Sequence, residues 1–382
     1  MRYRNFGSLD FQVSVLGFGC MRLPCLDGVA SGPGIDEEEA VRMIRYAIEQ
    51  GVNYVDTAYL YHGGNSELVL GKALRDGYRD RVKVATKAPM MRITKAQEYD
   101  AVLDEQLQKL GVEMIDFYLF HGLNKQTWEV VKNQELLARA EAAKKAGKIG
   151  HIGFSFHDPY EVFADIIEGY EGWEFCQIQY NYMDTEFQAG QKGLRLAASR
   201  GMGVVVMEPL QGGKLVNPPA EIKEIIRESG YAGSLADLAL KWLISQPEWS
   251  VFLSGMTAMK EVRENIEAAS TFTEGTLSGE EARLIDAVKV AYRERNKDCL
   301  PCSGCNYCLP CPHSVDIPAN IRFYNDGILY GYFNEAKRRY GFLLKPEQRA
   351  GACLECGRCD EVCPQKIPIS EWMPKIHAAL TS

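Results

Sequence analysis

The chain has 382 residues, 46% of them hydrophobic and 25% charged, which is typical of a soluble protein with two or three domains. Asp and Glu number 51 against 43 Lys and Arg, and the net charge of −8 excludes the basic surface that attracts nucleic acids and anionic membranes. The sequence contains no apolar run near the ~18 residues of a membrane helix, and its first residues lack a signal peptide's apolar stretch. We therefore expect a cytoplasmic protein that contacts neither membrane nor nucleic acid.

Residues 13–270 alternate short apolar runs with longer amphipathic segments, the pattern of buried strands and the helices that cover them. The predicted strands are Val13–Gly17, Val52–Asp56, Val82–Lys87, Ile115–Phe120, Ile149–Phe154, Phe175–Gln179, Gly203–Met207 and Val251–Ser254. The predicted helices begin near Asp36, Asn65, Thr94, Gln126, Asp158, Phe187, Ser234 and Lys260. Eight strand–helix units predict an α/β fold of the (β/α)8 TIM-barrel type, because a doubly wound open sheet would not usually need so many.

Two local patterns mark the ends of elements. Asp36 can cap the first predicted helix, Glu37–Glu39 suit the positive end of its dipole, and Gly51 ends it. At the N-terminus, Tyr3–Phe6 and Phe11–Val15 flank a short turn. They predict a small hairpin that closes the bottom of the barrel.

A second region begins where the apolar periodicity ends. Residues 277–296 predict one more helix, which leads into a cysteine-rich segment. Nine of the twelve cysteines lie between Cys299 and Cys363. We therefore predict a barrel domain over residues 1–294 and a smaller domain over residues 295–382.

The spacing of these cysteines favours metal binding. Disulfides need an oxidising compartment and are most common in short secreted chains. Residues 353–364, CLECGRCDEVCP, have the C-x2-C-x2-C-x3-C-P spacing of a bacterial ferredoxin, and residues 302–312 repeat it with one residue less before the last cysteine. Zinc explains paired CxxC motifs but not this three-plus-one pattern. The two cassettes therefore predict two [4Fe–4S] clusters.

The same spacing predicts which cysteines share a cluster. Three close thiolates hold one cluster, and the fourth cysteine, which precedes a proline, reaches the other. The predicted ligands are Cys302, Cys305, Cys308 and Cys363 for one cluster, and Cys353, Cys356, Cys359 and Cys311 for the other. Cys299 lies outside the pattern, as a spare thiol or an alternative ligand. The amphipathic residues 334–342 between the cassettes predict a mostly helical dicluster domain rather than a compact βαβ ferredoxin.

Motifs at the ends of the predicted strands resemble those of the aldo/keto reductase family. Asp56 and Tyr61 stand in DTAYLY after the second strand, Lys87 ends the third, and His121 follows the fourth. Further similar positions are Gly153–Ser155, Gln177, Glu208–Gly213 and the pair Glu264–Asn265. The resemblance covers roughly residues 1–275. With its cysteine-rich tail, the whole chain resembles the members that carry a C-terminal ferredoxin-type domain.

This resemblance implies that Tyr61 is the acid–base residue in the reduction of a small carbonyl compound, or in the reverse oxidation, with Lys87, Asp56 and His121 in support. Barrel enzymes build their active sites at the C-terminal ends of strands, where these residues lie. A tyrosine with a pKa of about 10 is a weak acid near neutrality. Lys87 would lower that pKa, and Asp56 would orient the lysine. His121 would donate a hydrogen bond to the substrate oxygen or join the proton relay.

The resemblance also implies a nicotinamide site, in which several residues differ from the family. The implied nucleotide contacts are Ser155, Gln177, Pro209, Leu210, Gly212, Gly213, Gly255 and Asn265. Phe156 stands where the family usually has the Asn that holds the carboxamide, and Met207 where an aromatic ring commonly stacks on the nicotinamide. Near the eighth strand only Lys260, beside Glu261, could meet the 2′-phosphate of NADPH. We therefore expect no strong preference for NADPH over NADH, and the glycine pair fits a phosphate loop or a plain turn.

Electron counting leaves the role of the clusters open. Nicotinamide delivers two electrons as hydride, whereas each cluster passes one at a time. Either a flavin or a nicotinamide binds at the barrel mouth, or the clusters pass single electrons between a substrate and a carrier such as a ferredoxin, or they are structural. The leading hypothesis is an iron–sulfur oxidoreductase. The alternative is an electron-transfer or redox-sensing module whose barrel binds a nucleotide or partner without turnover.

Overall fold

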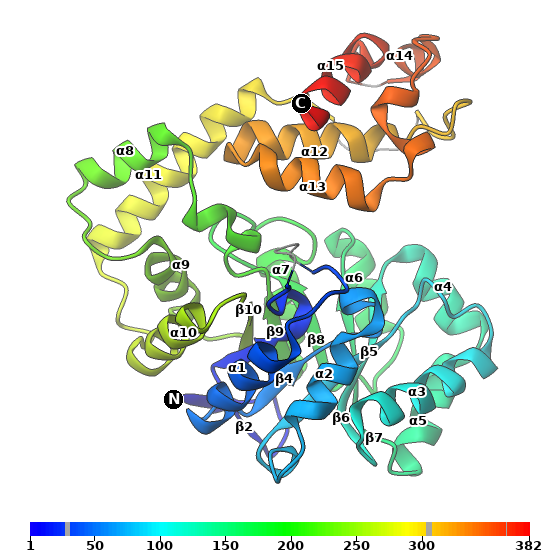
Figure 1. The fold of residues 1–382 in the computed structure, drawn as a ribbon, viewed down its shortest axis with the longest axis vertical. Coiled ribbons are helices and arrows are strands. Elements are labelled where there is room, and N and C mark those ends of the chain that lie inside the picture. Colours follow the sequence, from blue (N-terminus) through cyan, green and yellow to red (C-terminus); the bar gives the residue numbers. More distant parts are fainter. Residues whose placement is uncertain (27–30, 303–307, 364) are drawn as a thin grey trace. The chain divides into compact units, whose positions relative to one another are not determined.

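The computed structural model in Figure 1 describes residues 1–26, 31–302, 308–363 and 365–382. Contacts divide the chain into two compact units. The first comprises Met1–Gly212 and Ala239–Leu277, and the second comprises Gly213–Leu238 and Ser278–Ser382. Each unit has a hydrophobic core of its own.

The first unit contains a closed barrel of eight parallel strands, which confirms the predicted fold. In chain order the strands are β3 (Leu16–Gly19), β4 (Tyr54–Asp56), β5 (Lys83–Ala88), β6 (Ile115–Leu123), β7 (Ile149–Phe156), β8 (Phe175–Gln179), β9 (Gly203–Met207) and β10 (Val251–Gly255). Pairing of β10 with β3 closes the barrel, with Phe252 opposite Leu16 and Gly255 opposite Gly19. All eight C-terminal strand ends therefore form one rim.

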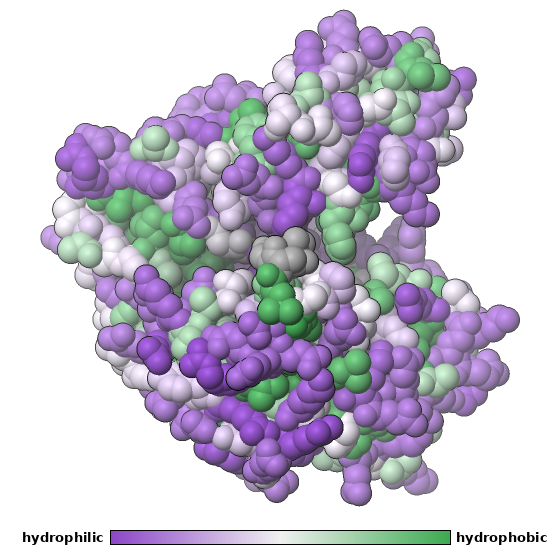
Figure 2. Space-filling view, in the orientation of Figure 1, coloured by the Kyte–Doolittle hydropathy of each residue, from purple (hydrophilic) through white to green (hydrophobic). Residues whose placement is uncertain are grey.

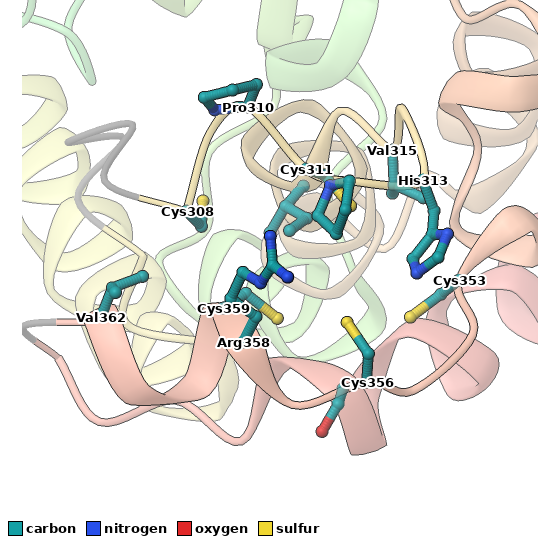
Figure 3. A pocket seen from close by; sticks show the side chains of 13 residues that line it. Cys308, Pro310, Cys311, His313, Val315, Cys353, Cys356, Arg358, Cys359 and Val362 are labelled. Atoms are coloured by element: carbon teal, nitrogen blue, oxygen red, sulfur yellow. The ribbon is translucent and has the colours of Figure 1, made fainter.

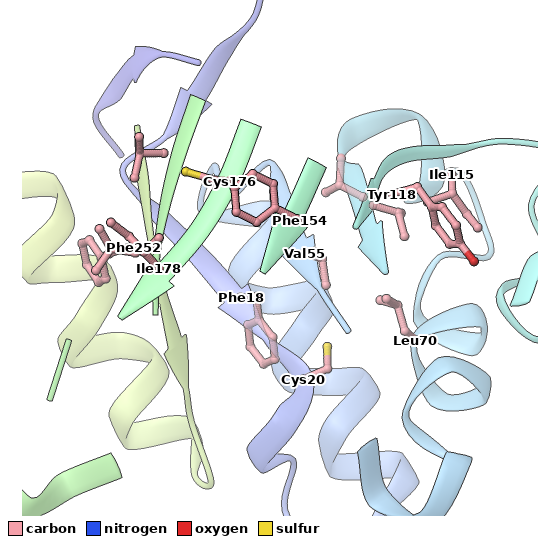
Figure 4. Close-up of a cluster of buried hydrophobic side chains, with 14 of the residues drawn as sticks. Phe18, Cys20, Val55, Leu70, Ile115, Tyr118, Phe154, Cys176, Ile178 and Phe252 are labelled. Carbon is pink, nitrogen blue, oxygen red and sulfur yellow. The ribbon is translucent and has the colours of Figure 1, made fainter. Parts of the chain in front are cut away.

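Helices follow the strands close to the eight predicted starts, and one further helix of this unit, Leu136–Lys145, was not predicted. They are α1 (Glu37–Glu49), α2 (Ser66–Ala73), α3 (Ala96–Leu110), α4 (Lys125–Asn133), α5 (Leu136–Lys145), α6 (Tyr160–Glu168), α7 (Gly190–Ser199), α9 (Leu235–Ile244) and α10 (Met259–Thr271). Asp36 caps α1 by accepting a hydrogen bond from the backbone N–H of Glu39, as expected for this residue. Outward-facing strand side chains, such as Val55, Phe154 and Phe252, form the core beneath these helices (Figure 4).

A hairpin at the N-terminus closes the opposite end of the barrel. Strand β1 (Tyr3–Asn5) pairs antiparallel with β2 (Gln12–Ser14), so the predicted strand 13–17 is split between this hairpin and β3. The fully buried Phe6 lies inside the barrel, and its ring centre is 4.6 Å from that of Phe117. The ring of Phe6 also lies against Gly203, because a Cβ atom added to Gly203 would be 2.3 Å from the ring carbons. The hairpin therefore plugs the N-terminal end of the barrel and leaves the C-terminal rim for chemistry.

The second unit is helical in its described residues, as expected for the cysteine-rich region. Its helices are α8 (Ala220–Glu228), α11 (Gly279–Arg295), α12 (Ile317–Tyr330), α13 (Phe333–Leu343), α14 (Arg358–Val362) and α15 (Ile369–Thr381). Lys214 joins residues 213–238 to α12 through a 2.8 Å ion pair with Asp326, and Arg295 on α11 bonds to Glu221 on α8. By its contacts the second unit therefore includes α11. The domain boundary that we expected between residues 294 and 295 stays a prediction.

Polar residues cover most of the face of the molecule shown in Figure 2. Among the helices of the described residues, none is long and apolar enough to cross a membrane.

We predict that Phe6→Ala lowers the free energy of unfolding by about 3–5 kcal/mol, because it removes a buried ring and leaves a cavity that the closed barrel cannot fill. Urea unfolding followed by tryptophan fluorescence measures the change. Phe187→Ala is the matched control, since that ring is 51% exposed, and its effect should stay within about 0.5 kcal/mol. Equal effects of the two substitutions would show that Phe6 does not plug the barrel.

Candidate active site and cysteine pocket

The four residues of the predicted catalytic set meet at the C-terminal rim of the barrel. Asp56 is the last residue of β4, Lys87 lies one residue before the end of β5, and His121 lies near the end of β6. Tyr61 begins the 3-10 turn η2 (Tyr61–Gly64), which follows β4. Neighbouring strands of the barrel thus bring together residues that are up to 65 positions apart in the sequence.

A buried ion pair forms the centre of this set. The Nζ of Lys87 donates hydrogen bonds to Oδ1 of Asp56 at 2.6 Å and to the carbonyl oxygen of Thr57 at 2.7 Å. Only 1% of Lys87 and 2% of Asp56 is exposed. The Nζ of Lys87 lies 5.0 Å from the ring centre of Tyr61, and the ring of His121 meets that ring edge-on at 6.0 Å. The arrangement joins an ammonium, a phenol and an imidazole in one site.

Burial sets the protonation states in this site. Burial raises the pKa of Tyr61 above its usual value, and the Lys87 ammonium, which lowers it as expected, only partly offsets that effect. Burial would lower the pKa of Lys87, but the charges of Asp56 and Tyr61 outweigh it and hold this pKa above its usual value. Burial, the positive charge of Lys87 and the nearby His157 lower the pKa of His121 to about 3. Near neutrality the site therefore holds a phenol, an ammonium and a neutral imidazole.

Several of the implied nucleotide contacts lie on the same rim. Ser155 near the end of β7 accepts a hydrogen bond from the backbone N–H of Gly122 at 2.8 Å. Gln177 on β8 is 2% exposed, and its Oε1 is a buried acceptor to which no described residue donates a hydrogen bond. Asn265 on α10 donates to Oγ of Ser254 at 2.9 Å. Phe156, in contrast, is fully buried, with its ring 5.1 Å from that of Phe163 on α6, and therefore belongs to the layer beneath the helices.

The loop after β9 contains Pro209, Leu210, Gly212 and Gly213. The φ angles of Gly212 and Gly213 are +63° and +94°, in the left-handed region that favours glycine. Such a loop exposes backbone N–H groups without side chains that obstruct them, which suits either a phosphate or a plain turn. Gly255, the last residue of β10, lies across the barrel seam from Gly19.

Sequence reasoning missed Arg22, which ends the 3-10 turn η1 (Cys20–Arg22) after β3. A Cβ on Gly212 would lie 2.6 Å from Nη2 of Arg22, and a Cβ on Gly255 would lie 3.1 Å from its aliphatic carbons. Within the described chain, no hydrogen bond or ion pair to this guanidinium is present. The carboxylate of Glu208 lies nearby, with Oε2 at 3.5 Å from the same position on Gly212. Arg22 is thus a cation between the two glycines that the family resemblance assigned to the nucleotide.

The second unit brings both cysteine cassettes to one pocket (Figure 3). The pocket contains about 540 Å³ of empty space, including its opening. Its thiols are those of Cys308, Cys311, Cys353, Cys356 and Cys359. They include all four predicted ligands of one cluster, three from the second cassette and Cys311 from the first. Thiolates from two segments around one space are the donor set that an iron–sulfur cluster needs.

The remaining predicted ligands are described only in part. Cys363 is 8% exposed and lies in the core of the second unit, and Cys302 packs against that core. Cys305 lies outside the described residues. The thiol of Cys299 contacts the carbonyl oxygen of Asn325 on α12 at 3.6 Å. In the described parts of the chain, no three His, Cys, Asp or Glu side chains converge on a point that could hold a single metal ion.

Comparison with known proteins identifies both parts of the chain. The model of the aldo/keto reductase family matches residues 15–289, and that of a 4Fe-4S dicluster domain matches residues 301–367. The chain belongs to the aldo/keto reductase family. It is an oxidoreductase with a C-terminal 4Fe-4S dicluster domain, which confirms the subgroup that its motifs indicated.

Relatives of known sequence or structure share the barrel. The NADH-specific methylglyoxal reductase of Escherichia coli (strain K12) is 26% identical over 319 residues, which cover 70% of this chain and 93% of that protein. The holo form of aldo-keto reductase AKR11C1 from Bacillus halodurans gives a TM-score of 0.62 at 25% identity and covers 75% of this chain and 96% of its own. An aldo-keto reductase from Klebsiella pneumoniae, solved in complex with NADPH, gives a TM-score of 0.59 at 24% identity, with 75% and 95% covered.

Proposed function

We propose that the barrel reduces a small carbonyl compound to an alcohol, or catalyses the reverse oxidation, with Tyr61 as the acid–base residue. The buried Lys87 ammonium supports this proposal most directly, because it is paired with Asp56 and lies 5.0 Å from the ring of Tyr61. An ammonium held beside a phenol favours loss of the phenol's proton at the moment when a substrate oxygen accepts it. A relative named as a methylglyoxal reductase agrees with a small carbonyl substrate.

Each residue then has a defined role. Tyr61 gives its proton to the carbonyl oxygen, and Lys87 stabilises the phenolate that remains. Asp56 keeps Lys87 charged and in place. Neutral His121 donates an N–H hydrogen bond to the same substrate oxygen. A nicotinamide or flavin, when bound, would supply a hydride to the carbonyl carbon, which together with the proton from Tyr61 would give the alcohol.

The nucleotide part of the proposal rests on Arg22 and the glycines beside it. A phosphate between Gly212 and Gly255 would meet the guanidinium of Arg22, which can form charge-assisted hydrogen bonds with it. Ser155, Gln177, Gly213 and Asn265 would line the rest of the site. Because Arg22 would meet a phosphate that NADH and NADPH share, it does not discriminate between them, and Lys260 is 82% exposed and paired with Glu264.

The dicluster part of the proposal is two [4Fe–4S] clusters with crossed ligands. One set is Cys353, Cys356, Cys359 and Cys311, of which all four line the pocket. The other is Cys302, Cys305, Cys308 and Cys363. The residues of these two sets would hold the clusters, which would exchange single electrons with a ferredoxin or another electron carrier. In the alternative function, a redox-sensing module, the barrel binds its ligand without turnover.

We predict about eight iron and about eight acid-labile sulfide per chain after anaerobic purification, because each cluster holds ~4 iron. Cys363→Ser should remove about half of this iron, since Cys363 completes the cluster of the distant first cassette. Cys299→Ser is the control and should retain it, because that thiol bonds to the backbone of Asn325. Stoichiometric zinc without sulfide, or full iron in the Cys363→Ser protein, would contradict the assignment.

We expect NADH and NADPH to bind with dissociation constants within about tenfold of each other, measured by isothermal titration. Arg22→Gln should weaken both by about 10–100-fold, because a charge-assisted hydrogen bond contributes ~1.5–3 kcal/mol. Arg263→Gln is the matched control, since Arg263 lies on the exposed side of α10, over the ring of Tyr46. A large advantage for NADPH, or unchanged affinity in the Arg22 variant, is the result that rejects this site.

Tyr61→Phe should reduce turnover by about 10²–10⁴-fold, the usual contribution of a positioned acid–base group. Lys87→Met should cost a similar factor, and the double variant much less than the product of both, because residues that act as one unit are not additive. The assay is a panel of carbonyl compounds under anaerobic conditions with NADH, NADPH or reduced ferredoxin.

Tyr59→Phe is the control for this series. Tyr59 lies two residues earlier and donates its hydroxyl to Glu105 at 2.8 Å, so its loss should leave turnover unchanged. Iron content should stay constant in all variants. Full activity of the Tyr61→Phe protein would reject aldo/keto reductase chemistry and favour the redox-sensing module.

A further inference from the structure

One cation lies among the thiols of the cysteine pocket. Arg358 is the first residue of α14 and directly precedes Cys359. Its side chain lines the pocket together with Cys308, Cys311, Cys353, Cys356 and Cys359, and of these thiols only that of Cys308 is a predicted ligand of the other cluster. Figure 3 shows its guanidinium directed into the space among these sulfurs. A permanent positive charge thus faces the position of the proposed cluster.

No carboxylate of the same segment neutralises this charge. Within the described residues, the guanidinium of Arg358 has no hydrogen bond or ion pair. The carboxylate of Asp360 accepts hydrogen bonds from the backbone N–H of Ser370 at 2.9 Å and from its hydroxyl group, and the Cys359 thiol lies 3.5 Å from it. Glu355 and Glu361 are exposed to solvent. Arg358 is itself exposed to solvent, and the charge that it can face inside the pocket is that of a cluster bound by the cysteines.

The first cassette differs at the corresponding position. The second cassette reads Cys-Gly-Arg-Cys at residues 356–359, whereas the first reads Cys-Asn-Tyr-Cys at residues 305–308. Tyr307 therefore replaces the cation by a neutral residue. Tyr307 itself lies outside the described residues.

We propose that Arg358 makes the cluster held by Cys311, Cys353, Cys356 and Cys359 the more easily reduced of the two. The proposal rests on the two clusters and the crossed ligands of the proposed function. Reduction adds one electron and therefore one negative charge to the cluster and its thiolates. A nearby cation stabilises that extra charge, and N–H donors to the sulfurs act in the same direction. A chain that carries one electron therefore holds it mainly on this cluster.

The test is a reductive titration of the anaerobic full-length protein with dithionite and redox mediators, followed by electron paramagnetic resonance. The wild-type protein should show two one-electron steps at different potentials. Arg358→Gln should lower the equilibrium constant of the higher-potential step about tenfold, which is ~59 mV for one electron, and leave the other step unchanged. Arg358→Lys keeps the charge and should retain most of the separation. Arg322→Gln on α12, an exposed arginine outside the pocket, is the matched control.

The outcomes separate this proposal from the proposed clusters. Iron and sulfide are measured first, and a wild-type protein without them rejects the clusters themselves. With both clusters present, an unchanged titration, an equal shift of both steps or a shift of only the lower step overturns the role of Arg358. If Arg358→Gln fails to hold its clusters, Tyr307→Arg decides the question. A higher potential of the lower step then supports the role of a cation at this position, and an unchanged potential rejects it.

Discussion

Closure of the barrel between β10 and β3 is the constraint on which the candidate active site depends. The pairing of Gly255 with Gly19 brings the first and last strands together, although they are more than 230 residues apart. It places the turn that contains Arg22 beside the end of β10. The same closure arranges β4, β5 and β6 side by side, so that Asp56, Lys87 and the residues that follow them share one rim.

The ion pair of Lys87 and Asp56 can form only because the closed barrel places β4 and β5 side by side. Two charges out of water are costly, and their attraction offsets that cost only with good geometry and further hydrogen bonds. The carbonyl oxygen of Thr57 supplies one such bond to Lys87. Among the described residues, however, Oδ2 of Asp56 has no hydrogen-bond partner, so this buried pair is not optimised for stability alone. An ammonium retained at that cost beside Tyr61 supports the proposed role of this pair in proton transfer.

The sequence predicted the features that depend on local patterns, and it missed those that depend on closure and burial. Alternating apolar and amphipathic runs indicated eight strands and their helices, and Asp36 marked the start of α1. Arg22 was missed because it lies far from Gly255 in the sequence and becomes its neighbour only where the closed barrel pairs the first strand with the last. The net rise in the pKa of Tyr61 was also missed, since it follows from burial that no pattern of residues reveals. One signal was available: in a barrel, the residue after strand one is always next to strand eight.

The two proposed sites of this chain lie in separate units, each with a hydrophobic core of its own. Tyr61, Lys87 and the barrel rim belong to the first, and the cysteine pocket with Arg358 belongs to the second. Substitutions at the rim therefore test the proposed proton transfer within the first unit, and substitutions of Arg358 test a charge near the thiols within the second unit. Because carbonyl reduction needs two electrons and a cluster passes one, the two sets of variants address different steps. If the Arg358 variants change turnover in the barrel as the rim variants do, single electrons from the clusters are tied to that turnover. If the Arg358 variants leave turnover unchanged, the clusters have a structural or sensing role.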